Sequence, residues 1–84
     1  MNSRLRATLL AVFAEPAPST LEWRRIEALL VACGARTIKG KGSRVRFVHG
    51  ETVATFHRPH PAKEAKPYQV RAAREFLEAM GVRP

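Results

Sequence analysis

Hydrophobic side chains recur at helical spacing near the start of the chain. They follow the i, i+4, i+7, i+8 pattern of a helix face that packs against a core. These positions are Leu5, Leu9, Val12 and Phe13. The pattern predicts a helix over residues 3–14, with Asn2 or Ser3 as its N-cap. Pro16-Ala17-Pro18 ends this helix and forms a stiff link to the rest of the chain.

Two further helices are predicted from the same period and from residues that favour helix ends. Ser19-Thr20-Leu21-Glu22 reads as a capping box that opens the second helix, and Gly34 reads as its left-handed stop. Pro67 suits the first position of the last helix, which Gly81 ends. The apolar stripes are Trp23, Ile26, Leu29, Leu30 and Cys33 in the second helix, and Val70, Ala73, Phe76, Leu77 and Met80 in the last.

Between these helices the pattern changes to the alternation of strands. Residues 35–39 predict a weak strand, and residues 44–48 and 52–57 predict a hairpin through His49-Gly50. With that loop, Val48 pairs with Glu51, Arg44 pairs with Thr55, and His57 falls opposite Gly42. The core face then carries Val45, Phe47, Ala54 and Phe56, and the opposite face carries Arg44, Arg46, Val53, Thr55 and His57.

The predicted fold class is α+β, with the order α-α-β-β-β-α. A three-stranded antiparallel sheet with helices packed on one face buries all the apolar stripes. Residues 1–84 are expected to form a single domain, because this length is too short for two cores. Within it, residues 1–18 make the N-terminal helix and proline linker, and residues 19–84 make the core.

Charge narrows the class of partner. The chain has 15 Lys and Arg against 7 Asp and Glu, a net charge of +8 over 84 residues. Such a balance favours a polyanion, and RNA is the expected one. The single Cys33 excludes an internal disulfide framework and agrees with the reducing cytoplasm. No apolar run approaches the roughly 20 residues of a membrane span, so no membrane partner is expected.

The candidate chemistry lies around the predicted hairpin. His57 is a candidate general base, because an imidazole titrates near neutral pH, or else a surface histidine that holds the following loop. Arg44 and Arg46 suit phosphate contacts. The remaining RNA-binding candidates are Lys39, Lys41, Gly42, Ser43, Arg58 and His60. The glycine-rich turn allows close backbone approach to a phosphate, or serves turn geometry only. No metal-ligand spacing is present, and no cofactor is expected.

Several motifs together resemble the HicA family of toxin–antitoxin toxins, from about Trp23 to Val82. They are Ile26-Glu27-Ala28-Leu29-Leu30 with Gly34, Gly42-Ser43, Lys63-Glu64-Ala65-Lys66-Pro67, and the segment from Arg74 to Gly81. The resemblance implies a double-stranded-RNA-binding-domain-like fold, endoribonuclease activity on mRNA without the ribosome, and a HicB-like antitoxin as partner.

One position departs from the family pattern. The family commonly carries its catalytic histidine directly after Gly-Ser, where this chain has Arg44. We therefore expect His57 on the neighbouring strand to act as the base, with Arg44 as a second catalytic group. The alternative is a module that binds RNA, or only its antitoxin, without cleaving.

Overall fold

Three helices and a three-stranded antiparallel sheet make up the computed structural model, which describes all 84 residues. The elements are α1 (Ser3–Val12), α2 (Trp23–Ala32), β1 (Arg36–Lys39), β2 (Arg44–His49), β3 (Thr52–His57) and α3 (Pro67–Ala79). The order confirms the predicted α-α-β-β-β-α arrangement and the α+β fold class. None of the three helices combines the length and apolarity that a membrane crossing requires.

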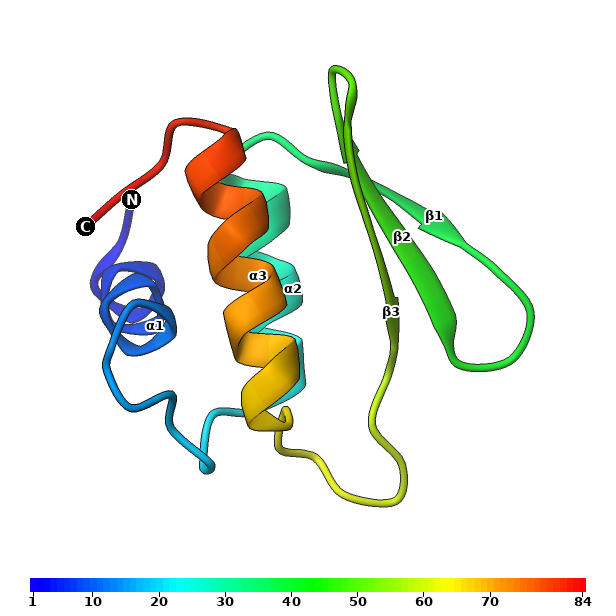
Figure 1. Cartoon of the computed structure of the whole chain (residues 1–84), viewed down its shortest axis with the longest axis horizontal. Helices are drawn as coiled ribbons and strands as arrows, with labels where there is room; N and C mark the ends of the chain where they lie inside the picture. Colours follow the sequence, from blue (N-terminus) through cyan, green and yellow to red (C-terminus); the bar gives the residue numbers. More distant parts are fainter.

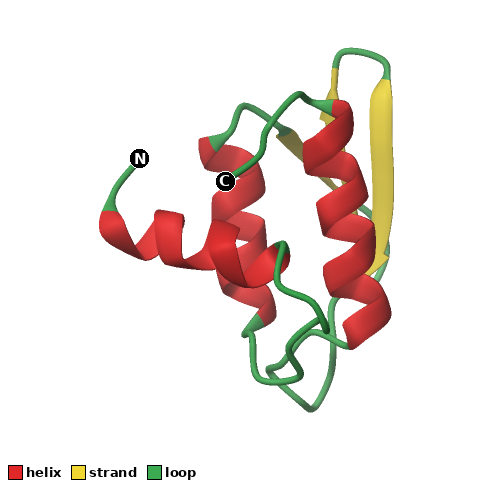
Figure 2. Ribbon diagram, turned by 60° about the vertical axis from the view of Figure 1, so that its left-hand side comes forward, coloured by secondary structure: helices red, strands yellow, loops and turns green.

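The elements stack in three layers. The sheet has the order β1-β2-β3, so β1 and β3 are its edges. Helices α2 and α3 cover one face of the sheet, and α1 lies on the far side of these two helices (Figure 1). The turned view shows the same succession, with α1 running across α2 (Figure 2). The opposite face of the sheet carries no covering element.

A single cluster of buried apolar side chains joins all three layers. Three aromatic rings form its contact between helix and sheet. Trp23 of α2 packs edge-on against Phe56 of β3 with ring centroids 4.9 Å apart, and Phe47 of β2 lies 6.0 Å from Phe56. Leu9 and Val12 bring α1 into the same cluster. Burial of these large side chains is the main favourable term holding the layers together.

Local residue chemistry explains most helix ends. The Asn2 side chain accepts a hydrogen bond from the backbone N–H of Leu5 at 2.8 Å, as expected of an N-cap. Gly34 and Gly81 have φ of +113° and +82° and end α2 and α3. At each end, two backbone N–H groups turn back to carbonyls of the last turn, which is the Schellman arrangement. Pro67 opens α3.

The predicted capping box at Ser19-Thr20-Leu21-Glu22 is wrong. Helix α2 begins at Trp23, and no side chain caps it. Instead this segment pairs with residues 63–65: the Ala65 N–H donates to the Leu21 carbonyl at 2.8 Å, and the Trp23 N–H donates to the Lys63 carbonyl at 2.9 Å. These backbone groups bind partners 40 and 44 residues away in the sequence, and a local motif cannot reveal such partners.

The register of the hairpin also differs from the prediction. Val48 pairs with Val53 and Arg44 pairs with His57, because the connecting residues are Gly50-Glu51 rather than His49-Gly50. Gly50 has φ of +60° while Glu51 does not, which is the pattern of a type II′ turn. The pairing moves by two residues. Each side chain therefore stays on the face that the alternation predicted.

Candidate nucleic-acid interface and active site

Arg44 and His57 are direct cross-strand neighbours on the uncovered face of the sheet. The backbone N–H of Arg58 donates to the Ser43 carbonyl at 2.8 Å, one position outward. Because hydrogen-bonded and non-hydrogen-bonded pairs alternate in an antiparallel ladder, Arg44 and His57 form a non-hydrogen-bonded pair. Side chains approach most closely in such pairs, with Cβ atoms about 4.5–5.5 Å apart. The two side chains thus start side by side, and the Arg44 side chain then extends over Gly40 and borders a different hollow from that of His57.

Besides this pair, the uncovered face carries two further arginines, no carboxylate, and the exposed apolar side chains of Ile38 and Val53. Arg46 lies opposite Thr55, and Arg36 of β1 lies opposite Val48. None of the three face arginines, including Arg44, makes an ion pair within the chain. No Phe, Tyr or Trp side chain is present on this face. Its chemistry therefore suits a phosphate backbone better than base stacking.

The glycine-rich turn before β2 positions the side chain of Arg44. A Cβ atom at Gly40 would lie only 3.2 Å from the Cβ of Arg44, so the arginine side chain packs directly over this glycine. Gly42 has φ of +60° and open space around it. A hollow of about 150 Å³ is bordered by Ile38, Lys39, Gly40, Arg44 and Arg46. Lys39 pairs with Val45, so its side chain projects from the helix-facing side, at the edge of the sheet.

Arg58 does not lie with the arginines of the uncovered face. Its guanidinium binds Glu27 of α2, with Nε 2.6 Å from Oε2, and Trp23 Nε1 donates to the same carboxylate. The hydrogen bond to Glu27 raises the pKa of Arg58 above its ordinary value. Strand alternation accounts for the placement, because Arg58 follows Phe56 by two residues and shares its helix-facing side. The arginine thus ties the loop after β3 to α2.

A second hollow, of about 200 Å³, lies where β3 ends and α3 begins. His57, His60, Lys66, Tyr68 and Gln69 are among its lining residues. Gln69 is buried and holds the two elements together. Its Nε2 donates to the His57 carbonyl at 2.8 Å, and its Oε1 accepts from the Lys66 N–H at 3.0 Å. Two imidazoles, an ammonium and a phenol therefore border one hollow, which is a suitable set for proton transfer.

Sequence reasoning missed the two residues that position this region, Glu27 and Gln69. A signal for Gln69 was present, because it occupies the third position of a helix that Pro67 opens, where a glutamine reaches back to the N-cap N–H. The local partner of Glu27 is Trp23, four positions earlier on α2, whereas its charged partner Arg58 lies 31 residues away and could not be found from local spacing. No group of three or more His, Cys, Asp or Glu side chains gathers anywhere in the structure.

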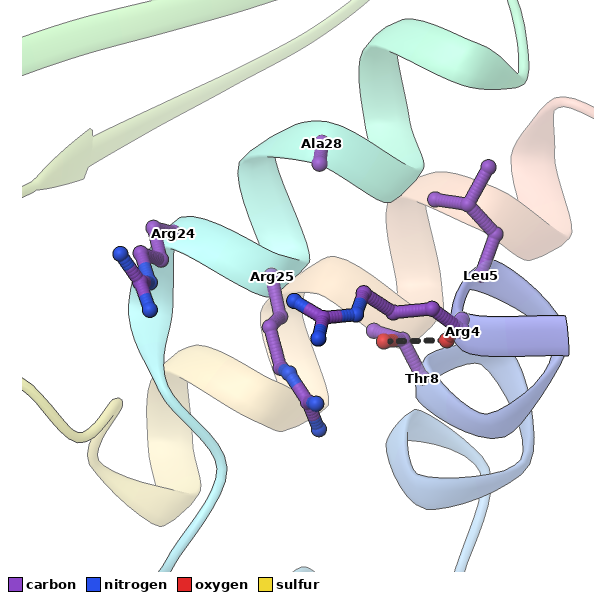
Figure 3. A pocket seen from close by; sticks show the side chains of 6 residues that line it. All are labelled: Arg4, Leu5, Thr8, Arg24, Arg25 and Ala28. Carbon is purple, nitrogen blue, oxygen red and sulfur yellow. Dashed lines mark hydrogen bonds between the residues drawn. The ribbon is translucent and has the colours of Figure 1, made fainter. Parts of the chain in front are cut away.

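A third hollow, of about 270 Å³, lies on the other side of the molecule, between α1 and α2 (Figure 3). No His, Cys, Asp or Glu side chain lines it, so it offers no general acid or base for catalysis near neutral pH. Its lining residues are Arg4, Leu5, Thr8, Arg24, Arg25 and Ala28.

Comparison with known proteins agrees with the motifs in the sequence. A family model described as HicA toxin of bacterial toxin-antitoxin matches residues 23–82. The match begins at the first residue of α2 and leaves α1 outside. No curated protein and no solved structure matches the chain.

Proposed function

Because the chain belongs to the HicA family of toxins of bacterial toxin–antitoxin systems, we propose that it is an endoribonuclease that cleaves mRNA and is neutralised by a HicB-like antitoxin in the cytoplasm. The single observation that carries the catalytic part of this proposal is the direct pairing of Arg44 with His57. The position where the family commonly has histidine here holds an arginine, and an imidazole lies immediately across the ladder from it.

In the proposed reaction, His57 removes the proton of a ribose 2′-hydroxyl. The 2′-oxygen attacks the adjacent phosphorus, and the bond from phosphorus to the 5′-oxygen breaks. Arg44 and Arg46 stabilise the negative charge that develops on the phosphoryl oxygens. The products are a 2′,3′-cyclic phosphate and a 5′-hydroxyl. No metal or other cofactor is required in this scheme.

The 5′-oxygen needs a proton as it leaves, and His60 is our candidate donor because it lines the same hollow as His57. Pro59 and Pro61 restrict the backbone on both sides of His60, and Arg58 fixes the start of the loop through Glu27. Lys66 borders the hollow and offers a further positive charge. Lys39, Lys41, Gly42 and Ser43 lie at the turn before β2 and would contact neighbouring phosphates, the last two through their backbone.

The proposal is tested by expressing the wild type and His57→Ala and by following transcript integrity and growth. We expect transcript loss with the wild type and intact transcripts with His57→Ala. Intact transcripts with both proteins, at equal expression, would contradict the enzymatic function.

The role of His60 has its own test. An RNA whose scissile 5′-oxygen is replaced by sulfur has a leaving group that needs no proton. His60→Ala should cleave this substrate almost as fast as the wild type does, whereas His57→Ala should not. Equal impairment of His60→Ala on both substrates would remove His60 as the acid.

One observation favours a second candidate function, a module that binds RNA or antitoxin without cleaving. Arg44 occupies the position of the usual catalytic histidine, so cleavage is lost if no other imidazole replaces it. A non-catalytic module would bind RNA with salt-dependent affinity and leave it intact. A module that binds only its antitoxin would not bind RNA at all.

A further inference from the structure

The hollow between α1 and α2 brings together arginines from two helices, and two of them have no carboxylate partner. Arg4 and Arg25 make no ion pair, whereas Arg24 is paired with Glu22 at 2.9 Å. Figure 3 shows Arg4 reaching from α1 toward α2, with its guanidinium close to the side chain of Arg25, while Arg24 points away. Two guanidinium groups that share one hollow repel each other, and an anion placed between them removes this repulsion.

The chemistry of these two groups selects the anion. A guanidinium presents a rigid fork of N–H donors that fits two oxygens of a phosphate or a carboxylate. The volume of about 270 Å³ leaves room for a phosphate with part of a nucleotide. Thr8 also borders the hollow. Its hydroxyl already donates its proton to the Arg4 carbonyl at 3.0 Å, so the donors for the anion are the two guanidinium groups.

This hollow is connected to the proposed reaction centre by shared residues. It shares Arg24 with a neighbouring hollow that is bordered by Lys63, Arg58 and Pro59. That hollow in turn shares Arg58 and Pro59 with the hollow of His57 and His60. These three hollows therefore lie in succession along the surface, from α1 past the start of α2 to the end of β3, and we call this succession the path.

Charge and polarity along the path favour a nucleic acid over a protein segment. The carboxylates beside it are already bound, Glu22 by Arg24 and Glu27 by Arg58. A protein partner would need apolar pockets for anchoring side chains. The path offers few apolar lining residues, and the hollow of α1 has only Leu5 and Ala28. The path also leads directly to the imidazoles.

We infer that Arg4 and Arg25 bind phosphates of the same RNA strand that is cleaved at His57. Helix α1, which lies outside the family match, thereby extends the RNA-binding path beyond the part of the chain shared with the family. This inference rests on the proposed function, because it assumes that RNA binds at the end of β3. It predicts that affinity rises with RNA length until the strand reaches α1.

The test compares binding of two single-stranded 2′-O-methyl RNAs, of about 4 and about 16 nucleotides, which bracket common site sizes for single strands. The methyl group blocks the 2′-oxygen, so binding is measured without cleavage. The variant is Arg4→Ala/Arg25→Ala. Its matched control is Arg6→Ala/Arg71→Ala, which also removes two positive charges, since both arginines are exposed, make no ion pair and lie outside the three hollows.

We expect the double alanine variant to bind the long RNA about tenfold more weakly than the wild type. The salt dependence of its binding constant should fall by about one unit in slope for each arginine removed. Binding of the short RNA at the reaction centre, and cleavage of a short substrate, should be unchanged. The control variant should lose much less affinity for the long RNA.

The outcomes separate the two proposals. Equal losses in the double alanine variant and in the control would contradict the inference and leave cleavage at His57 standing. Loss of affinity for a purified antitoxin, with RNA binding unchanged, would also overturn it in favour of a protein partner. If the wild type binds neither RNA, the proposed function fails together with the inference.

Discussion

The Arg58 guanidinium binds the Glu27 carboxylate through two hydrogen bonds, Nε to Oε2 at 2.6 Å and Nη2 to Oε1 at 3.2 Å. The same carboxylate accepts from Trp23. We expect Glu27→Ala to lower the free energy of unfolding by about 2 kcal/mol, because two donors lose a charged acceptor and both side chains are only partly exposed. Urea unfolding measures the change.

Glu75→Ala is the control for this substitution, because Glu75 is an exposed carboxylate on α3 with no ion pair. It should change the free energy of unfolding by less than about 0.5 kcal/mol. Equal effects of the two substitutions would mean that Glu27 contributes only its charge to the fold.

Gly40 and Gly42 give a test that separates the position of Arg44 from backbone strain. An added Cβ at Gly40 would press on the Arg44 side chain at 3.2 Å, whereas at Gly42 it would meet nothing within 4 Å. We expect Gly40→Ala to keep the stability and reduce RNA cleavage about tenfold by displacing Arg44. Gly42→Ala should cost about 1 kcal/mol of stability through its positive φ. Its cleavage rate should fall less, because alanine at this position keeps the backbone N–H that would contact a phosphate and does not press on Arg44.

Arg44 itself should be needed for the transition state. Arg44→Ala should reduce the cleavage rate on the order of a hundredfold, about 3 kcal/mol, while the melting temperature changes little. If Arg44 is only one phosphate contact among several, the change will instead weaken binding modestly. In the double variant Arg44→His/His57→Ala, we expect incomplete recovery. Full activity there would show that the position of the imidazole is interchangeable.

Helix α1 should contribute to the stability of the isolated protein. Leu9 is buried between α1 and the other helices, whereas Leu10 beside it is 57% exposed. Leu9→Ala should lower the free energy of unfolding by about 3 kcal/mol, and Leu10→Ala by less than about 0.5 kcal/mol. Deletion of residues 1–17 should lower the melting temperature as well. An unchanged melting curve after the deletion would mean that α1 contributes nothing to the core.

Cys33 should give the protein a measurable pH dependence. Partial burial raises the pKa of its thiol above the ordinary value of 9.0. The neutral thiol is thus favoured by folding. This contribution is fully present below the pKa of the unfolded thiol and is lost as pH rises through the folded pKa. The difference in free energy of unfolding between wild type and Cys33→Ala should therefore be constant around neutral pH. At alkaline pH the wild type should lose stability relative to the variant. A constant difference throughout would contradict the effect of burial.

The helices, their glycine stops and the two faces of the hairpin could be predicted because each depends on residues a few positions apart. The periodicity of α3 and the glycine after it are local facts. The start of α2 could not be predicted in this way, because the backbone around Leu21 pairs with a segment near Ala65. The predicted register was wrong because the turn begins at Gly50 rather than at His49. Strand alternation also predicts that Arg58 and Arg44 lie on opposite faces of the sheet. This prediction only requires the pairing of β3 to continue for one residue beyond His57.

Arg74 ties α1 to α3, with hydrogen bonds to the carbonyls of Val12 and Ala14 and an ion pair to Glu15 at 2.7 Å. The Val12 contact spans 62 residues, so α1 depends on a segment that is synthesised much later than α1 itself. A nascent chain that lacks α3 also lacks Gln69 and, with it, the contact that holds the end of β3. Folding therefore completes only after α3 has left the ribosome, since contacts this distant in sequence form late. Interrupted translation would release basic fragments in which the hollow of His57 is not assembled. Only chains that are translated through α3 would then carry the proposed activity.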